Sequence, residues 1–498
     1  MADFTFDEIP LDWVEPGTYL EARPNYAQLG LLPYPVKNLI IGQILSTGSL
    51  KEGEIVEVVN ADDAIALFGA GSSGAEMVKA FRAGNSTQPL YVTGLLDDVS
   101  GVAATGSLAF NGTVSAASVL RFKIGGRSVK ISVAAKDDMP AIATKLAAAI
   151  SQDDAMPVKA TAAIGTVSLT AKYTGELGND IDFRVDSAAA PLPQGLDVTI
   201  TPMADGAGNP DINKVLDSLA QNWFTSLSVP WTDKTNMEAL ALWLDEQFKA
   251  MSKRDCLGFV AKRAGFSEAV AWGKLTNCAF LSAAPLKASP TSSWALAASL
   301  QGIAAKHLAD DPARQLRTLM LPNVQAPDSA DQWTEQERDL LLRSGCSSLT
   351  CTAEGAVTIS RIITTYKHNN LGTADRAWLD IMTSATVSRI RYDWAAFITL
   401  NYPRCKLADD DDVAAFAGRL DSNGLPDNAV VTPGRMKASW AGRCALYANQ
   451  AWIIDVDQTI RDSIFERSPS DKNRMQSRQR INIIGNLMVF AGSLEFRA

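Results

Sequence analysis

Histidine is scarce in this 498-residue chain, which contains only His307 and His368. Histidine is the commonest general acid or base near neutral pH, so its scarcity narrows the catalytic options. His307 continues a helical apolar stripe with Leu296 and Leu300, and His368 lies in TTYKHNN before a polar turn. No G-x-S-x-G or comparable nucleophile motif accompanies either one. The sequence therefore argues against an enzyme, and a hydrolase using these two residues is a weak alternative.

Paired cysteines, long apolar runs and a leader segment are also missing. None of the six cysteines forms a C-x-x-C pair, so we expect free thiols in a reducing compartment and no zinc site. They are Cys256, Cys278, Cys346, Cys351, Cys405 and Cys444. No run of 18 apolar residues is present, so no membrane insertion is expected. The start, MADFTFDEIP, is acidic and lacks the apolar region of a signal peptide, so synthesis in the cytoplasm is expected.

Positive charge is in deficit, because 55 acidic residues face 46 basic ones and the formal net charge is -9. An acidic chain without a basic block is a poor candidate for nucleic-acid binding. The four aspartates at 409–412 lack the alternating spacing and turn glycine of a calcium loop, and we interpret them as the acidic start of a helix. We therefore predict no metal and no cofactor.

One segment does carry a known motif: LFGAGSSGAEMVKAF, at 67–81, places Gly69, Gly71 and Gly74 in the spacing G-x-G-x-x-G. In a dinucleotide-binding turn, a strand ends just before the first glycine and the pyrophosphate lies on the following helix. Here a short helix is predicted before Gly69, with Asn60 as its N-cap and Phe68 on its apolar face. We favour a helix–turn–helix connection, with a nucleotide-binding oxidoreductase as the alternative.

Both ends of the chain are predicted to be extended. The first 36 residues contain five prolines, and GTYLEAR within them has strand character. The chain ends in INIIGNLMVFAGSLEF, an apolar strand-like segment. The N-terminal strand has no evident local partner; the C-terminal one either lacks a partner too or forms an edge strand within its own subunit. Unpaired strands are a means of joining copies of a chain.

Residues 101–205 differ in composition from their surroundings, being rich in Ala, Thr, Gly and Val. LRFKIGGRSVKISV predicts a hairpin whose tight turn uses Gly125 and Gly126. A helix follows, with Asp138 as its cap and Pro140 in its first turn. TVSLTAKY, IDFRVD and LDVTITPM read as further short strands. These features predict a compact β-rich insertion with one helix packed on it.

The following residues alternate between predicted strands and helices up to about 345, which is typical of an α/β domain with a largely parallel sheet. LTCTAEGAVTISRIITTY then predicts a hairpin. A long helix is expected over ADRAWLDIMTSATVSRIRYDWAAFI, and SWAGRCALYANQAWIIDV reads as strand. Residues 461–480 carry six basic and three acidic side chains, a local excess of three positive charges.

Several of these segments together resemble one family. DDAIALFGAGSSGAEMVKAF, GVAATGSLAFNGT, SVLRFKIGGRSVKISV, PVKATAAIGTVSLTAKYTGELGNDIDFR and the terminal INIIGNLMVFAGSLEF are similar to contractile phage tail sheath proteins of the Mu-like type. PGTYLEA resembles that family's N-terminal arm. The resemblance covers most of the chain in order and is least distinctive over 204–300.

The resemblance implies a structural virion protein, assembled in the host cytoplasm. Sheath subunits stack as hexameric rings around a tail tube and contract to drive the tube through the host envelope, and their arms add strands to neighbouring subunits. The implied partners are other sheath subunits, the tube protein, and baseplate and tail terminator proteins. The implied fold is α/β plus a β-rich insertion, with extended N- and C-terminal arms and a central α/β domain similar to subtilisin but without its catalytic residues.

On this basis we divide the chain into six parts. They are the N-terminal arm (1–36), the first part of the α/β sheath domain (37–100), the inserted β-rich outer domain (101–205), the main α/β sheath domain (206–372), the C-terminal inner, tube-proximal domain (373–480) and the C-terminal arm (481–498).

Two groups of residues are the candidate assembly sites. The arm residues expected to bind neighbouring subunits are Tyr19, Leu20, Leu487, Val489, Leu494 and Phe496. A basic cluster, which either faces an acidic tube or neighbour or is simply a solvated loop, comprises Arg467, Lys472, Arg474, Arg478 and Arg480.

Overall fold

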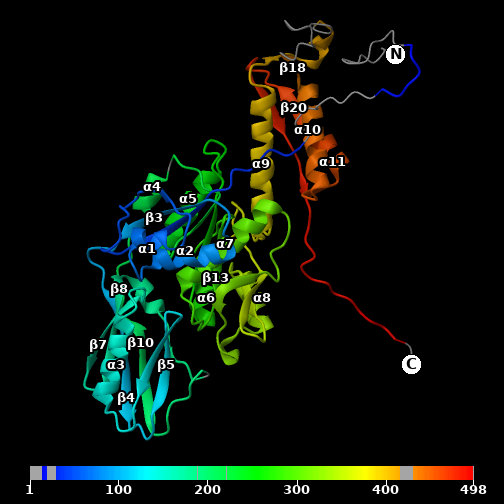
Figure 1. The fold of residues 1–498 in the computed structure, drawn as a ribbon. Coiled ribbons are helices and arrows are strands. Elements are labelled where there is room, and N and C mark those ends of the chain that lie inside the picture. Colours follow the sequence, from blue (N-terminus) through cyan, green and yellow to red (C-terminus); the bar gives the residue numbers. More distant parts are fainter. Residues whose placement is uncertain (1–13, 20–29, 188, 220, 416–429, 497–498) are drawn as a thin grey trace.

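The computed structural model describes residues 14–19, 30–187, 189–219, 221–415 and 430–496. The molecule is elongated (Figure 1). An α/β body lies in the middle, a β-rich part extends from one end, and a mainly helical C-terminal part lies at the other. The long helix α9 (Ile381–Asn401) connects the body to the C-terminal part, and the last residues extend away from the body as a separate segment.

A six-stranded sheet forms the centre of the body, in the order β13-β12-β11-β1-β3-β2. Every neighbouring pair is parallel except β2 with β3, so the predicted, largely parallel sheet is confirmed. The seven residues of β1 are all buried, as expected for a central strand covered on both faces. The strands are β1 (Asn38–Ile44), β2 (Val56–Glu57), β3 (Leu90–Leu96), β11 (Ser226–Ser228), β12 (Leu257–Lys262) and β13 (Leu281–Pro285).

Helices cover the sheet and begin at side chains that satisfy their free amides. Asp233 accepts a hydrogen bond from the Asn236 amide at the start of α5, and Thr334 forms a capping box with Glu337 at the start of α8. Helix α7 is buried along most of its length and packs against α2 and β12. The helices are α1 (Asp63–Phe68), α2 (Ser73–Gly84), α4 (Asn213–Ser218), α5 (Lys234–Phe248), α6 (Phe266–Gly273), α7 (Ser293–Asp310), η2 (Ser329–Asp331) and α8 (Glu335–Arg343).

The β-rich part contains two sheets, β10-β4-β8-β7 and β6-β5-β9, with helix α3 packed on them. The predicted hairpin is confirmed, since Ile124 pairs with Arg127 across Gly125 and Gly126, both of which have positive φ. Asp138 caps α3 as predicted. The elements are β4 (Ala103–Gly112), β5 (Ser118–Ile124), β6 (Arg127–Val133), α3 (Met139–Ser151), β7 (Val158–Ala163), β8 (Thr166–Thr174), η1 (Glu176–Asp180), β9 (Phe183–Val185) and β10 (Leu196–Ala204).

A small antiparallel sheet lies beside α7, with the strand order β14-β16-β15. Its strands β15 and β16 form the hairpin predicted for LTCTAEGAVTISRIITTY. Its strands are β14 (Met320–Gln325), β15 (Ser348–Cys351) and β16 (Ala356–Arg361).

The C-terminal part combines helices with short pairs of strands. After α9 its elements are β17 (Lys406–Leu407), η3 (Asp410–Ala415), β18 (Val430–Val431), α10 (Pro433–Asn449), β19 (Ile453–Ile454), α11 (Val456–Asp462), β20 (Ile464–Arg467), β21 (Met475–Arg478) and β22 (Asn482–Ile483). The strand prediction for SWAGRCALYANQAWIIDV is wrong over SWAGRCALYAN, because these residues belong to α10, and only Ile453–Ile454 form a strand. Thr432 caps this helix, Pro433 begins it, and Met436, Trp440 and Cys444 recur at helical spacing on its buried face.

Other predicted boundaries also change. Helix α9 begins at Ile381, later than expected, because the Asp380 carboxylate forms a two-bonded ion pair with Arg361 and the residues before it form a loop. The N-cap of α1 is Asp62 and not Asn60. The predicted strand EIVEVV is reduced to β2, and of the C-terminal apolar segment only β22 is strand.

Candidate functional site

The glycine motif lies between two helices, as the helix–turn–helix interpretation predicted. Helix α1 ends at Phe68, directly before Gly69, and α2 begins after its cap Ser72, whose hydroxyl accepts a hydrogen bond from the Ala75 amide. No strand leads into Gly69, so the arrangement of a dinucleotide-binding turn is not present here.

Two of these glycines pack closely against other parts of the protein. A Cβ atom on Gly71 would lie 2.3 Å from the Met156 carbonyl oxygen, and one on Gly74 would lie 2.4 Å from the Phe68 ring. Gly71 also has a φ of 83°, a conformation that other residues adopt only with strain. The glycines therefore allow close packing between α2, α1 and the β-rich part, although Gly71 and Ser72 also line an open cavity between α2 and the β-rich part.

The groups considered for catalysis or metal binding have ordinary structural roles. His307 is half-buried in the last turn of α7, and His368 is exposed in a loop. Asp409 forms an ion pair with Arg467, and Asp410 accepts hydrogen bonds from the Gly434 amide at the start of α10. All six cysteines are free thiols. In the described ranges, no group of three or more His, Cys, Asp or Glu side chains could hold a metal ion.

No helix in the described ranges is long and apolar enough to cross a bilayer.

The N-terminal candidates are only partly described. Tyr19 is 44% exposed, and its hydroxyl donates to the Glu15 carbonyl at 3.5 Å; residues 17–19 contain no strand. Leu20 lies outside the described residues. From residue 30 onward the chain is firmly attached: the Leu32 amide donates to the Asp393 carboxylate of α9, and the Arg443 guanidinium of α10 donates to the Gly30 carbonyl.

The C-terminal segment is attached to both the C-terminal part and the body. Its strand β22 pairs with β19, so Ile483 lies opposite Ile453. The Asn486 side chain then donates to the Ala313 carbonyl at 2.8 Å and accepts from the Gln315 amide at 3.2 Å. Met488 packs against the hydrophobic cluster of the body. This segment therefore crosses from one part of the molecule to the other before it leaves the surface.

Beyond Met488 the C-terminal segment extends away from the rest of the molecule, as the red end of the ribbon in Figure 1 shows. Residues 489–496 make no backbone hydrogen bond to any other described part of the chain. Their apolar side chains are largely in water: Val489 is 78% exposed, Phe490 85%, Leu494 96% and Phe496 87%, and the neighbouring Leu487 is 71% exposed. Such a cluster of exposed large apolar residues indicates a binding segment.

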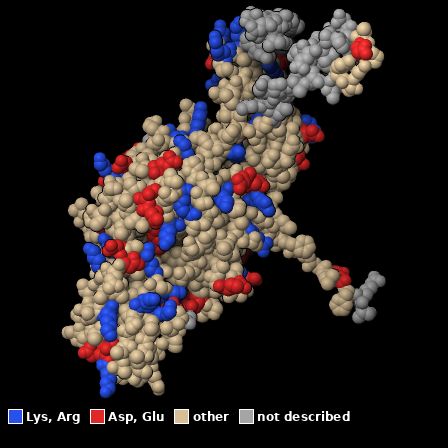
Figure 2. Space-filling model, in the orientation of Figure 1, with Lys and Arg blue, Asp and Glu red and all other residues tan. Residues whose placement is uncertain are grey.

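The basic cluster lies along the β20–β21 hairpin and just after it. Arg467 is paired with Asp409, whereas Lys472, Arg474, Arg478 and Arg480 are exposed and have no ion-pair partner among the described residues. The cluster is therefore spread along one hairpin and the residues after it, and does not form a closed site. Over the face seen in Figure 2, acidic and basic side chains are intermixed, and no broad field of one sign covers it.

Sequence reasoning missed the buried polar cluster between α9 and α10. Asp393 is 1% exposed and Arg443 3%, and the Tyr447 hydroxyl donates to the Asp393 carboxylate at 2.6 Å. One feature of the sequence could have indicated this cluster: each helix has a charged residue on its apolar face. Because charged side chains are rarely fully buried unless they are paired, these two residues could have been predicted to bind each other. Their partners at Gly30 and Leu32 are more than 350 residues away in the sequence, so no local pattern links them.

Comparison with known proteins gives one family. Residues 205–365 match the model of the phage tail sheath protein central domain. The chain is 32% identical over 493 residues to the Mu-like prophage FluMu tail sheath protein of Haemophilus influenzae, covering 99% of both chains.

Solved structures of sheath tail proteins are also similar. The protein from Desulfitobacterium hafniense is 11% identical with a TM-score of 0.47, and the match covers 94% of this chain and all of that one. The protein from Listeria innocua is 12% identical with a TM-score of 0.49, covering 92% and 94%. On the full-length identity to the Haemophilus protein, the chain belongs to the contractile phage tail sheath proteins of the Mu-like type, which are structural components of the phage tail.

Proposed function

We propose that this subunit polymerises around the tail tube as stacked hexameric rings, and that its arms hold neighbouring subunits together by adding β-strands to them. The observation that carries this proposal is the C-terminal segment 489–496, which is apolar, exposed and without backbone partners in its own subunit. Burial of such a segment in a neighbour removes apolar area from water and satisfies its backbone groups together.

The C-terminal part supplies edges that such a strand could join. Its three described sheets, β17-β18, β19-β22 and β20-β21, have two strands each, so every strand has an open edge. Two-stranded sheets are marginally stable alone and gain from a third strand. The β20–β21 hairpin is the longest of the three, with four residues in each strand. Exposed basic residues flank β21, and Glu495 in the arm has the opposite charge.

Disulfide trapping between two single variants tests whether the C-terminal segment of one subunit pairs with the open edge of β21 in another. Val489→Cys and Ser477→Cys subunits are mixed, assembled and oxidised, so that a bond between the two positions can form only across subunits. We expect a covalent dimer containing one of each variant. Thr161→Cys is the matched control, because it lies exposed on β7, the edge strand of a sheet in the β-rich part. Equal trapping at Thr161, or none at Ser477, would contradict the β21 edge as acceptor.

We propose that the basic cluster Arg467, Lys472, Arg474, Arg478 and Arg480 meets an acidic surface of the tail tube or of a neighbouring subunit. The net charge of -9 on each subunit supports the second partner. Replacing Arg478 and Arg480 by serine then weakens polymerisation of the isolated subunit without any tube. If polymerisation is unchanged and only tube binding is lost, the tube is the partner; if neither changes, the cluster is a solvated loop.

The remaining expectations belong to the same proposal. From family membership we propose that contraction drives the tube through the host envelope, that the sheath attaches to baseplate and tail terminator proteins, and that it assembles in the host cytoplasm. We also propose the subtilisin-like, non-catalytic character of the central domain and the six-part division of the chain. Contraction needs no catalytic step if the extended polymer is metastable and subunits gain contacts as they reorient. No observation favours nucleotide binding at Gly69, Gly71 and Gly74, so we do not propose an oxidoreductase.

A further inference from the structure

We infer that Asp393 and Arg443 are positioning residues that fix where the N-terminal arm leaves the subunit, by holding the backbone of residues 30–32. The inference rests on the proposed function, in which the residues before this point reach a neighbouring copy. It adds a specific contact inside the subunit, which we call the anchor. The anchor consists of Asp393 on α9 and Arg443 on α10, bound to each other and to the backbone of residues 30 and 32.

The anchor is a closed network of charged hydrogen bonds. Arg443 donates from Nε to Asp393 Oδ2 at 2.9 Å and from Nη2 to Asp393 Oδ1. The Leu32 amide donates to Asp393 Oδ1 at 2.9 Å, and Arg443 Nη1 donates to the Gly30 carbonyl oxygen at 3.0 Å. Burial alone would lower the pKa of Arg443, but the hydrogen bonds to the Asp393 carboxylate raise it overall, so the guanidinium stays charged.

The two backbone groups that are held belong to residues two positions apart, the Gly30 carbonyl and the Leu32 amide. Arg443 supplies a donor and Asp393 an acceptor, so the ion pair satisfies both groups in place of another backbone segment. A pair that served only to join α9 to α10 would not need to bind the backbone of a third segment.

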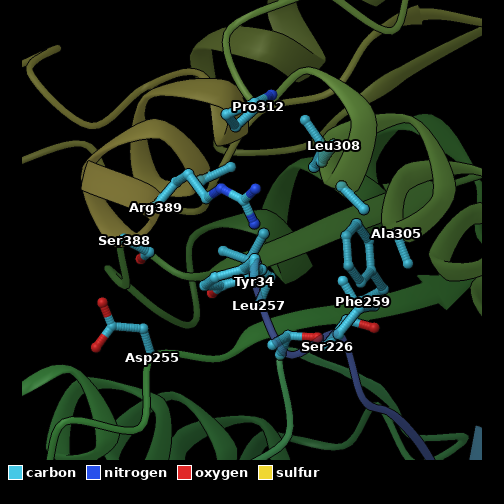
Figure 3. Close-up of a pocket in the computed structure, with 14 residues that line it drawn as sticks. Tyr34, Ser226, Asp255, Leu257, Phe259, Ala305, Leu308, Pro312, Ser388 and Arg389 are labelled. Atoms are coloured by element: carbon cyan, nitrogen blue, oxygen red, sulfur yellow. The ribbon is translucent and has the colours of Figure 1, made fainter. Parts of the chain in front are cut away.

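Side-chain contacts on either side of the anchor fix the direction of the segment. Leu31 packs against the cluster formed by α9 and α10, and Leu32 is 6% exposed. The Tyr34 ring lies under the Arg389 guanidinium at 4.7 Å and meets the Tyr392 ring edge-on at 5.3 Å. Figure 3 shows Tyr34 and Arg389 pointing toward one another at a cavity between α9 and the body. The segment is therefore held by the C-terminal part and by the joint between α9 and the body, which Tyr34, Asp255 and Arg389 line.

The C-terminal segment is held by the body, through Asn486 on Ala313 and Gln315. The N-terminal segment is held at Asp393, near the middle of α9, so each segment has a fixed starting point. Each arm then begins its path to a neighbour from a defined position, which reduces the conformational freedom lost on assembly. The expected consequence of losing the anchor is weaker assembly by a subunit that still folds.

The decisive comparison is Leu32→Pro against Leu32→Ala. Proline removes the amide donor to Asp393, whereas alanine keeps it; both remove the leucine side chain. We expect both variants to melt within a few degrees of each other, while the critical concentration for polymerisation is at least tenfold higher for Leu32→Pro. Equal critical concentrations for the two variants would overturn the inference.

A second variant tests the side chains that α9 and α10 contribute to the anchor. Asp393→Leu, Arg443→Met and Tyr447→Phe together replace the buried polar cluster by apolar groups, which avoids leaving one charge unpaired. We expect faster hydrogen–deuterium exchange in the peptide covering 30–36 of the monomer and loss of polymers. Unchanged exchange in a folded triple variant would contradict the anchor. Because exchange is measured on monomers, this result is independent of whether the wild-type protein polymerises, which tests the proposed function separately.

Discussion

At the residue scale, Gly71 illustrates how one sequence pattern can serve two purposes. The G-x-G-x-x-G spacing is used for phosphate binding in one class of folds, because glycine permits close approach and positive φ. Here the same two properties bring the start of α2 against the Met156 carbonyl of the β-rich part. The sequence predicted the two helices around the motif correctly, but the group that approaches the glycine comes from 85 residues later and could not be predicted.

The first prediction concerns this glycine. Gly71→Ala should lower the free energy of unfolding by about 2–4 kcal/mol, because the backbone is strained and the new methyl group meets a carbonyl oxygen. Gly265→Ala is the matched control, since a Cβ there meets no atom within 4 Å. Urea unfolding of both variants measures the difference. Equal stability of the two variants would show that the close contact at Met156 does not exist.

The second prediction concerns Asp255, which is buried in the joint beside Arg391. Burial raises the pKa of this carboxyl to about 6, although the Arg391 guanidinium opposes the shift. The pKa in the folded state lies above the value near 3.8 of an unperturbed aspartate, so the folded state favours the protonated form. The stability from this group is therefore fully present below about pH 3.8 and is lost as the pH rises from there through about 6.

Asp255→Asn tests this pH dependence. Relative to the wild type, the variant should gain about 1–3 kcal/mol of unfolding free energy between pH 4 and pH 7. Denaturant unfolding at a series of pH values measures it, with Asp197→Asn as an exposed control. A constant difference between Asp255→Asn and the wild type over this range would contradict the raised pKa.

At the scale of elements, regular periodicity made most of the fold predictable. The alternation of strands and helices correctly predicted the parallel sheet, and the Gly125–Gly126 pair correctly predicted the β5–β6 hairpin. Prediction failed where tertiary contacts determine the element. Apolar residues are frequent in the second half of α10, and this composition suggested a strand. The C-terminal segment has the composition of a strand, but only the two residues of β22 find a partner strand, β19, in the same subunit.

The third prediction tests α10 as a helix with a defined start. Thr432→Ala removes a hydroxyl that accepts from the Arg435 amide, so it should cost about 1 kcal/mol of stability. Asp62→Ala is the control, because Asp62 precedes α1 but its side chain makes no capping hydrogen bond. Thermal unfolding followed by circular dichroism compares them. A larger loss for Asp62→Ala than for Thr432→Ala would contradict this arrangement.

At the scale of the whole molecule, the C-terminal segment 489–496 is exposed and the two-stranded sheets of the C-terminal part have open edges. Head-to-tail contacts between such surfaces form rings or helical assemblies. The exposed C-terminal segment was predictable from the apolar, strand-like end of the sequence, whereas the N-terminal arm stays a prediction. The anchor at Asp393 and Arg443 was not, since it joins residues that only the folded chain brings together.

The most direct test of the account is negative-stain electron microscopy of the purified full-length protein beside a variant that ends at Met488. The variant keeps β22 and the Asn486 contacts, so it should fold and melt like the full-length chain. We predict rings or tubes from the full-length protein and dispersed single subunits from the variant at the same concentration. Polymers that form equally well without residues 489–498, or a full-length protein that stays monomeric at all concentrations, would contradict the claim that the C-terminal arm joins sheath subunits.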